Sequence, residues 1–333
     1  MYKQGVRLRQ WKESAKVEID IEKALEQYLL KNACIEHKTE QARQEQSQLQ
    51  RIHRYAKEWL KKAKKYSIGY KLSDKLKLIE IAFLDSIPTP IRKRNSALDL
   101  FASSLADHLC AKLTIKLDDI IYTIRDAESL RILSHEFEPF LLQWLQPKAG
   151  EVFVDIGAHL GKHAIAVSKL VGSEGQVIAM EAIPANFTSL KKNIELNKLK
   201  NIISFNIAAW NRRCELKFFK GSTSANANIN RHDYGFGNVK AQAERPDKLL
   251  LDNIGLKRVD WIKIDVEGAE YEVMLGLEET LTRFRPTLFV EVWSQNMSKV
   301  KAFLKKHNYR IDRVSEFGKA QSQYYVEALF VPN

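Results

Sequence analysis

The chain has 333 residues, of which 45% are hydrophobic and 28% are charged, and this composition excludes a disordered or fibrous protein. At about 150 residues per domain, the length allows one large domain or two modest ones. Cys34, Cys110 and Cys214 lie far apart and form no CxxC pair, which excludes a disulfide framework and a zinc ribbon. No apolar run reaches the ~18 residues of a membrane helix, and the first residues hold no apolar signal core. We therefore expect a cytoplasmic protein without a transmembrane segment.

The net charge of +12 is concentrated at the N-terminus, where residues 1–70 hold 16 basic and 9 acidic side chains. Such an excess can attract nucleic acid, an anionic membrane surface or an acidic polymer. A solvated helix face is the simpler interpretation of the same charge.

The first part of the chain is predicted to be helical. Residues 11–65 contain neither Gly nor Pro, and their apolar residues recur at helical spacing. The helical pattern continues over 73–87, stops at the PTP sequence of 88–90, and resumes over 95–110. We expect a basic helical region over 1–110, which could form a homo-oligomer, dock the protein to a larger assembly, or bind an anionic partner.

The second region, 111–333, begins with a short preamble over 111–150. Residues 112–126 alternate in steps of two around Asp118 and Asp119, which predicts a β-hairpin. Residues 128–145 are helical in pattern and end at the PKAG sequence of 147–150.

From residue 151 onward, apolar strands alternate with amphipathic helices. Strands are expected over 151–157, 176–182, 202–210, 215–220, 259–266, 287–293, 309–317 and 324–333, with helices over 161–171, 186–197, 269–283 and 297–307. Nearly continuous Val, Ile and Phe runs bounded by helices indicate buried parallel strands, whereas the last two strands have no helix between them and should be antiparallel. The predicted fold class is α/β, a Rossmann-like, doubly wound and mostly parallel sheet with an antiparallel C-terminal edge.

Two acidic motifs follow the first two strands of this sheet. The first strand ends in Asp155-Ile156-Gly157 and reaches Gly161 at the start of a helix, where ligands bind in doubly wound sheets. Gly157 permits a tight turn, and Gly161 would let the helix N-terminus approach a ligand. Glu181 ends the second strand, where a carboxylate can accept hydrogen bonds from two ribose hydroxyls. Together they favour an adenosine cofactor over an ordinary glycine-containing turn.

Three further carboxylates are predicted at the same edge of the sheet. Asp265 and Glu267 end the fourth strand, and Glu291 ends the fifth. They could act as a general base, a metal site or a hydrogen-bonding clamp, although Glu267 could instead cap the following helix. Lys263, two residues before Asp265, should need Asp265 or Glu291 as a partner because it lies in an apolar strand. The polar loop 221–238, with His232, Tyr234 and Phe236, suits either carbohydrate binding or a surface loop.

The sequences FVDIGAHLGKHA, VIAMEAIPANFTSLKKN, VDWIKIDVEGAEYEVMLGL and RPTLFVEVW resemble the FkbM family of class I S-adenosylmethionine-dependent methyltransferases. The resemblance covers about 115–333, and the KIDVEGAE string is its most specific part. It implies S-adenosyl-L-methionine as cofactor and methyl transfer to a hydroxyl of a sugar, glycan or secondary metabolite.

By position, the resemblance places Asp155, Gly157 and Gly161 at the methionine portion of the cofactor and Glu181 at its ribose. Asn206, Ile207 and Ala208 would flank adenine, while Asp265 and Glu267 would face the reaction centre, with Asp265 also near the cofactor. His159 replaces the Gly or Asn of relatives and could contact the cofactor carboxylate or act as a base. We expect Asp265 to be the base, followed by Glu267, Glu291 and His159. A divalent metal held by Asp265, Glu267 and Glu291 is an alternative that we do not expect.

Three alternative functions are weighed against the same sequence motifs. An RNA or protein methyltransferase could use the basic N-terminal helices to dock its substrate, although the Asp265-Val266-Glu267-Gly268 sequence lacks the proline-containing tetrapeptide of amine-methylating enzymes. A non-catalytic nucleotide-binding scaffold would not need Asp155, Gly157, Gly161 and Glu181. A dehydrogenase would need the GxGxxG fingerprint, which the DxGxxxG turn lacks.

Overall fold

A computed structural model describes residues 73, 74, 77, 105, 108–110, 113–133, 141–220, 227–228, 238–315 and 325–333. Most of the predicted helical region 1–110 lies outside these residues. So does most of loop 221–238, including His232, Tyr234 and Phe236. Among the described helices, none combines the length and the apolar character needed to cross a bilayer.

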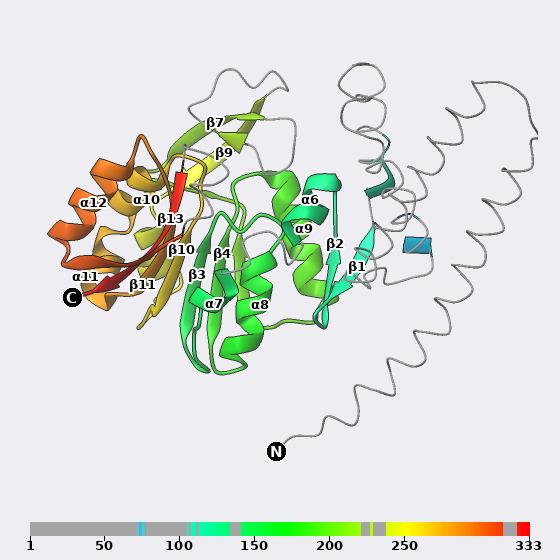
Figure 1. The fold of residues 1–333 in the computed structure, drawn as a ribbon, viewed down its shortest axis with the longest axis horizontal. Coiled ribbons are helices and arrows are strands. Elements are labelled where there is room, and N and C mark those ends of the chain that lie inside the picture. The colour runs from blue at the N-terminus through cyan, green and yellow to red at the C-terminus, as the bar shows by residue number, and fades with distance from the viewer. Residues whose placement is uncertain are drawn as a thin grey trace, which may run out of the picture. The chain divides into compact units, whose positions relative to one another are not determined.

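A seven-stranded sheet forms the centre of the described part, in the order β12-β13-β11-β10-β3-β4-β5 (Figure 1). Strands β3, β4, β5, β10 and β11 are parallel, whereas β13 runs antiparallel to both β11 and β12. This arrangement confirms the predicted α/β fold class. In chain order the strands are β3 (Val152–Ile156), β4 (Gln176–Met180), β5 (Ile202–Phe205), β10 (Trp261–Ile264), β11 (Thr287–Trp293), β12 (Tyr309–Val314) and β13 (Tyr325–Pro332).

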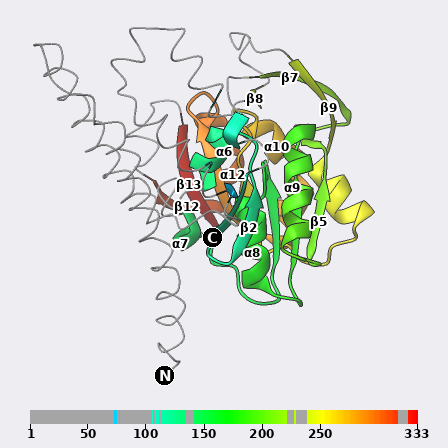
Figure 2. The same ribbon diagram turned by 90° about the vertical axis from the view of Figure 1, so that its right-hand side faces the viewer.

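Helices cover both faces of the sheet (Figures 1 and 2). Because side chains alternate along a strand, Ile262 and Ile264 of β10 enter one apolar core, while Phe153 of β3 enters the other. The first core is closed by α10 (Glu270–Gly276), α11 (Glu278–Phe284), α12 (Met297–Lys306) and a π-helix (Lys248–Asn253). The second is closed by α7 (Leu141–Trp144), α8 (Lys162–Val171) and α9 (Pro184–Leu196).

The structure divides two elements that the sequence predicts as continuous. The expected strand 202–210 separates into β5 and β6 (Ala208–Ala209), which belong to different sheets. The expected helix 269–283 breaks between α10 and α11, where Gly276 packs so closely that a Cβ atom would lie 2.2 Å from the Trp210 carbonyl oxygen. Residues 128–145 give α6 (Ala127–Leu133) and α7, with 134–140 between them outside the described residues.

A second sheet, which sequence patterning missed, has the order β6-β9-β7-β8 in the described residues. Its main pair is β7 (Cys214–Lys220) with β9 (Asn238–Glu244), and β8 (Ala227–Asn228) extends it. The sequence predicts β7 as a strand, but its partner β9 lies further along the chain, with 17 residues between Lys220 and Asn238. A pairing between strands so far apart in sequence leaves no short-range turn signal.

The predicted hairpin is confirmed as β1 (Thr114–Leu117) and β2 (Ile120–Thr123), turned by Asp118 and Asp119 with φ angles of 45° and 66°. Its β2 edge docks on α9 through two asparagines spaced four residues apart. Asn193 Oδ1 accepts from the Thr123 N–H at 2.7 Å, and Asn197 Oδ1 accepts from the Ile121 N–H at 2.9 Å. The two side-chain amides thus take the place of a neighbouring strand.

The turn after β3 lies against the end of β10. Gly157 has a φ of +84°, and a Cβ atom there would lie 1.8 Å from the Asp265 carbonyl oxygen. No side chain fits in this contact. The glycine therefore serves both the tight turn that the sequence predicts and the close approach of two strand ends.

We expect Asn193→Ala to lower the free energy of unfolding by about 1–3 kcal/mol, because it leaves the buried Thr123 N–H and Leu160 carbonyl without their amide partner. Urea denaturation measures the loss, with Lys192→Ala on the exposed face of α9 as the control for helix propensity. A loss below about 0.5 kcal/mol would show that the hairpin does not depend on this amide.

Gly157→Ala should be far more destabilising than Gly150→Ala. Both glycines have nearly the same φ angle, +84° and +82°, but Gly150 has open space around its Cβ position. The left-handed conformation alone costs roughly 1–2 kcal/mol, so Gly150→Ala isolates this contribution. We expect Gly157→Ala to cost at least about 2 kcal/mol more by urea denaturation. Equal losses would contradict the proposed backbone contact.

Candidate active site

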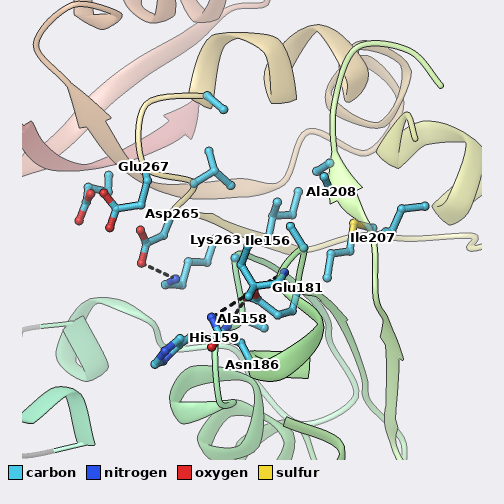
Figure 3. Close-up of a pocket in the computed structure, with 18 of the residues that line it drawn as sticks. Ile156, Ala158, His159, Glu181, Asn186, Ile207, Ala208, Lys263, Asp265 and Glu267 are labelled. Carbon is cyan, nitrogen blue, oxygen red and sulfur yellow. Dashed lines mark hydrogen bonds and ion pairs between the residues drawn. The ribbon is translucent and has the colours of Figure 1, made fainter. Parts of the chain in front are cut away.

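A cavity opens at the carboxyl ends of the parallel strands, where doubly wound sheets bind ligands (Figure 3). Its lining includes most of the residues predicted from the strand ends: Gly157, His159, Glu181, Ile207, Ala208, Asp265, Glu267 and Glu291. Residues at the ends of β3, β4, β10 and β11 are thus brought to one site, although Gly157 and Glu291 lie more than 100 positions apart in sequence.

Glu181 lies at the end of β4 with its carboxylate buried in the cavity wall. Oε2 accepts from the His159 N–H at 2.8 Å, and Oε1 accepts from the Ile183 N–H at 2.9 Å and from the Asn186 amide at 3.4 Å. Burial raises the pKa of Glu181 from 4.5 to about 7, and these hydrogen bonds limit the rise. Since a carboxylate offers about four acceptor positions, capacity remains for a ligand hydroxyl.

His159 contacts Glu181 through its backbone, in a left-handed conformation with φ of 52°. Burial lowers the pKa of its imidazole to about 4, so the ring is neutral at pH 7 and is a weak base. The close-up shows the ring turned away from the Glu181 carboxylate (Figure 3). A role for His159 as catalytic base stays a prediction, and its geometry favours a structural role for the backbone N–H.

Three residues that the family resemblance places at the cofactor lie outside the cavity lining. Gly161, with φ of +96°, faces Leu190 of α9, where a Cβ atom would approach the Leu190 Cδ1 to 2.7 Å, so its small size serves helix packing. Asn206 is exposed and donates to the Glu181 and Ala182 carbonyl oxygens at 2.9 and 3.2 Å. It thereby ties the end of β5 to the end of β4. A direct cofactor contact by these two residues stays a prediction.

Asp155, the third, is fully buried beneath the cavity floor and pairs with Lys263. The Lys263 Nζ lies 3.6 Å from Asp155 Oδ1 and 3.0 Å from Asp265 Oδ2. The sequence-based expectation that Lys263 needs a carboxylate is confirmed, with Asp265 as one of its two partners. Burial raises the pKa of Asp155, and the Lys263 charge opposes that rise.

Asp265, Glu267 and Glu291 converge at the other end of the cavity, with one carboxylate oxygen of each within 4.8 Å of the others. Glu267 has a φ of 54°, an uncommon conformation for a residue with a Cβ atom. Ala269 is the N-cap residue of α10, and the alternative that the Glu267 charge stabilises the start of this helix stays a prediction. Such a cluster could hold a divalent ion or bind the hydroxyls of a substrate.

The loop that carries Glu267 is held by a hydrogen-bonded pair that the sequence analysis missed. Glu270 is fully buried and accepts from the Gly268 N–H and from the Asn296 amide, both at 2.7 Å. Asn296 also donates to the Gly268 carbonyl oxygen at 2.8 Å. An amide after β11 and an acid at the start of α10 have no sequence signal that pairs them, because only the fold brings them together.

The small sheet and its surroundings supply an apolar wall opposite Glu181. Trp210, Leu216 and Phe218 line the cavity there, next to Ile207 and Ala208. Flat apolar surfaces of this kind accommodate an aromatic base. The cavity therefore has three parts: a hydrogen-bonding site at Glu181, an apolar wall, and an acidic cluster around Asp265.

Comparison with known proteins finds similarity to methyltransferases. Residues 155–311 match the sequence profile of the methyltransferase FkbM domain. Methyltransferase 1 of Beauveria bassiana (strain ARSEF 2860) is 23% identical over 145 residues, which cover 38% of this chain and 58% of that protein. This chain thus spans less than two thirds of that relative.

Solved structures of similar fold include the methyltransferase FkbM from Methylobacillus flagellatus KT, at 14% identity and a TM-score of 0.43, over 57% of this chain and 46% of that one. Another is M. jannaschii TYW2 in complex with AdoMet, at 17% identity and a TM-score of 0.38, over 66% of this chain and 86% of that one. Residues 155–311, which carry the cavity from Gly157 to Glu291, belong to the methyltransferase FkbM family.

Proposed function

We propose that this chain is an S-adenosylmethionine-dependent methyltransferase that methylates a hydroxyl of a sugar, glycan or secondary metabolite. The observation that carries the proposal is the single cavity that joins Glu181 at one end to the Asp265 cluster at the other. The family match over 155–311 supports the methyl-transfer chemistry.

The residues present fit S-adenosylmethionine. Glu181 would bind the ribose hydroxyls, the Ala208 and Phe218 side of the cavity would hold adenine, and Gly157 would allow close backbone approach at the methionine portion. When bound, the cofactor would supply a methyl group on an activated sulfonium centre. What remains for the protein is to align the acceptor oxygen, exclude water and remove a proton.

Asp265 is the residue best placed to remove the proton from the hydroxyl group that is methylated. It lies between the cofactor part of the cavity and the carboxylates of Glu267 and Glu291, and its side chain is 29% exposed. A carboxylate base at an alcohol typically contributes 10²–10⁴-fold to the rate. Glu267 and Glu291 would accept hydrogen bonds from neighbouring hydroxyls of the acceptor, which suits a polyhydroxylated substrate.

The alternatives of an RNA or protein substrate and of a homo-oligomer depend on residues that the structure does not describe. Docking of RNA or protein would use the basic region 1–70, and homo-oligomerisation would use the helices predicted over 1–110. A scaffold without activity would bind the nucleoside yet transfer nothing. A divalent ion at the acidic cluster is a further alternative, and the removal of metal from the protein distinguishes it from Asp265 acting as a base.

We expect Glu181→Gln to bind S-adenosylhomocysteine about 10–100-fold more weakly at pH 8, because the charged acceptor for ribose is lost. With a pKa of about 7, Glu181 is mostly ionised at pH 8 and mostly protonated at pH 6. Wild-type affinity should therefore fall about tenfold over this interval, and this component should be absent from the variant. Calorimetric titration measures both, with exposed Glu195→Gln as the control. Equal affinities for wild type and variant would contradict the ribose assignment.

Asp265→Asn should reduce methyl transfer by about 10²–10⁴-fold and change the S-adenosylhomocysteine Kd less than about threefold, because it removes a base and preserves the side-chain size. Transfer from S-adenosyl-[methyl-¹⁴C]methionine to a panel of free sugars, glycans and phenolic alcohols measures the rate. Exposed Asp252→Asn is the matched control.

The same assay is repeated after dialysis against EDTA. We expect an unchanged rate if the acidic cluster acts through proton transfer and hydrogen bonds, whereas loss restored by Mg²⁺ would support the metal alternative. A variant of Asp265 that transfers methyl groups at the wild-type rate would contradict its assignment as base.

A further inference from the structure

Lys263 lies in the middle of β10, a position that a parallel sheet normally gives to an apolar side chain. Its flanking residues Ile262 and Ile264 point into the apolar core on one face, and Lys263 points to the other. The lysine is 2% exposed, so its charge is removed from solvent. Burial of an ammonium group is unfavourable in free energy unless the group is paired. The presence of Lys263 here therefore needs an explanation beyond packing.

The register of the sheet fixes the surroundings of this lysine. Lys263 is aligned with Asp155 on β3 and with Phe289 on β11, so one neighbour is acidic and the other is apolar. Asp265 follows the end of β10, two residues after Lys263, and its carboxylate reaches the Lys263 ammonium group. The ammonium group thus lies between a fully buried carboxylate and one at the cavity surface, at 3.6 and 3.0 Å.

The acidic cluster explains why Asp265 needs an attractive partner. Carboxylate oxygens of Asp265, Glu267 and Glu291 lie within 4.8 Å of one another, a separation at which like charges repel. Asp265 begins the loop after β10, and its backbone N–H donates to the Ile156 carbonyl oxygen at 3.0 Å, whereas its side chain depends on other partners. Among the described residues of the cavity wall, Lys263 is the cation in contact with this carboxylate, as the close-up shows (Figure 3).

We propose that Lys263 is a positioning residue, which binds Oδ2 of Asp265 and so directs the other carboxylate oxygen at the acceptor, while Asp155 serves as the permanent counter-charge of Lys263. The catalytic part of this inference rests on the proposed function. The assignment gives Asp155 a role beneath the site in place of direct contact with the cofactor.

The second carboxylate is needed because Asp265 changes charge during the reaction. When Asp265 accepts the proton of the acceptor hydroxyl, it becomes neutral, and Lys263 loses one of its two counter-charges. Asp155 is fully buried and does not line the cavity, so it remains paired with Lys263 throughout. The lysine can therefore stay charged and in place for the next turnover.

A double variant separates positioning from folding. Lys263→Met alone should lower the urea unfolding midpoint, because it leaves the Asp155 carboxylate buried without its cation. Lys263→Met combined with Asp155→Asn removes both buried charges and should recover most of that loss. Exposed Lys200→Met is the control for the substitution itself. In the double variant the S-adenosylhomocysteine Kd should stay within about threefold of wild type, because neither change reaches the ribose site.

The decisive comparison is made on the double variant. With the ¹⁴C-methyl transfer assay, we expect kcat about 10²-fold below wild type and little change in the KM for S-adenosylmethionine. The reason is that the base, Asp265, is still present in the double variant but is no longer held in its position. In its crystal structure with S-adenosylhomocysteine, the Asp265 carboxylate should leave the position that it occupies beside Lys263.

Other outcomes overturn the proposal. A stable double variant with a wild-type rate, or with Asp265 in its original position, would show that Lys263 does not position it. A double variant as unstable as Lys263→Met would show that the lysine serves the fold. If the wild type binds neither S-adenosylmethionine nor S-adenosylhomocysteine, the proposed function fails, while the unfolding measurements and a ligand-free crystal structure still test the placement of Asp265.

Discussion

The contact between the turn after β3 and the end of β10 is the constraint on which the site depends. Gly157 lies so close to the Asp265 carbonyl oxygen that no side chain fits between them. This contact joins two segments that are more than 100 residues apart and gives each a fixed partner. The turn leads to His159, whose N–H holds Glu181, while the strand end carries Asp265 towards the acidic cluster. One backbone contact thereby sets the spacing between the two ends of the cavity.

The buried charged residues and their partners also restrict the side-chain positions in the site. Glu181, Asp155 and Lys263 are each less than 6% exposed, yet each has partners that compensate its burial. Backbone N–H groups donate to Glu181, and the Lys263 ammonium group places an opposite charge 3.6 Å from Asp155. Because unpaired buried charges would be strongly unfavourable, these partners restrict the side chains to few positions. The same buried pairs therefore contribute to a rigid site and, in the case of Lys263, to the placement of the expected base.

Sequence patterning predicted the main sheet well and the small sheet poorly, for a physical reason. Buried parallel strands such as β3 and β10 are apolar except for one charged residue each, and a short turn with Asp118 and Asp119 marks the hairpin. The β7–β9 pair joins strands that are 17 residues apart in the chain, so neither local propensity nor turn chemistry indicates the pairing. The break between α10 and α11 likewise follows from a tertiary contact of Gly276 with Trp210.

The sequence by itself determined the fold class, the family and the strand-end residues Gly157, Glu181, Asp265, Glu267 and Glu291, because parallel strands bring their carboxyl ends to one edge. The tertiary structure decided which of the expected residues reach the cavity. Asp155 and Gly161 are placed behind its wall, one as the ion partner of Lys263 and one as a packing position against Leu190. It also brought Asn296 to Glu270. Such roles depend on which side chain lies opposite another across the sheet or between helices, and a linear pattern does not contain that information.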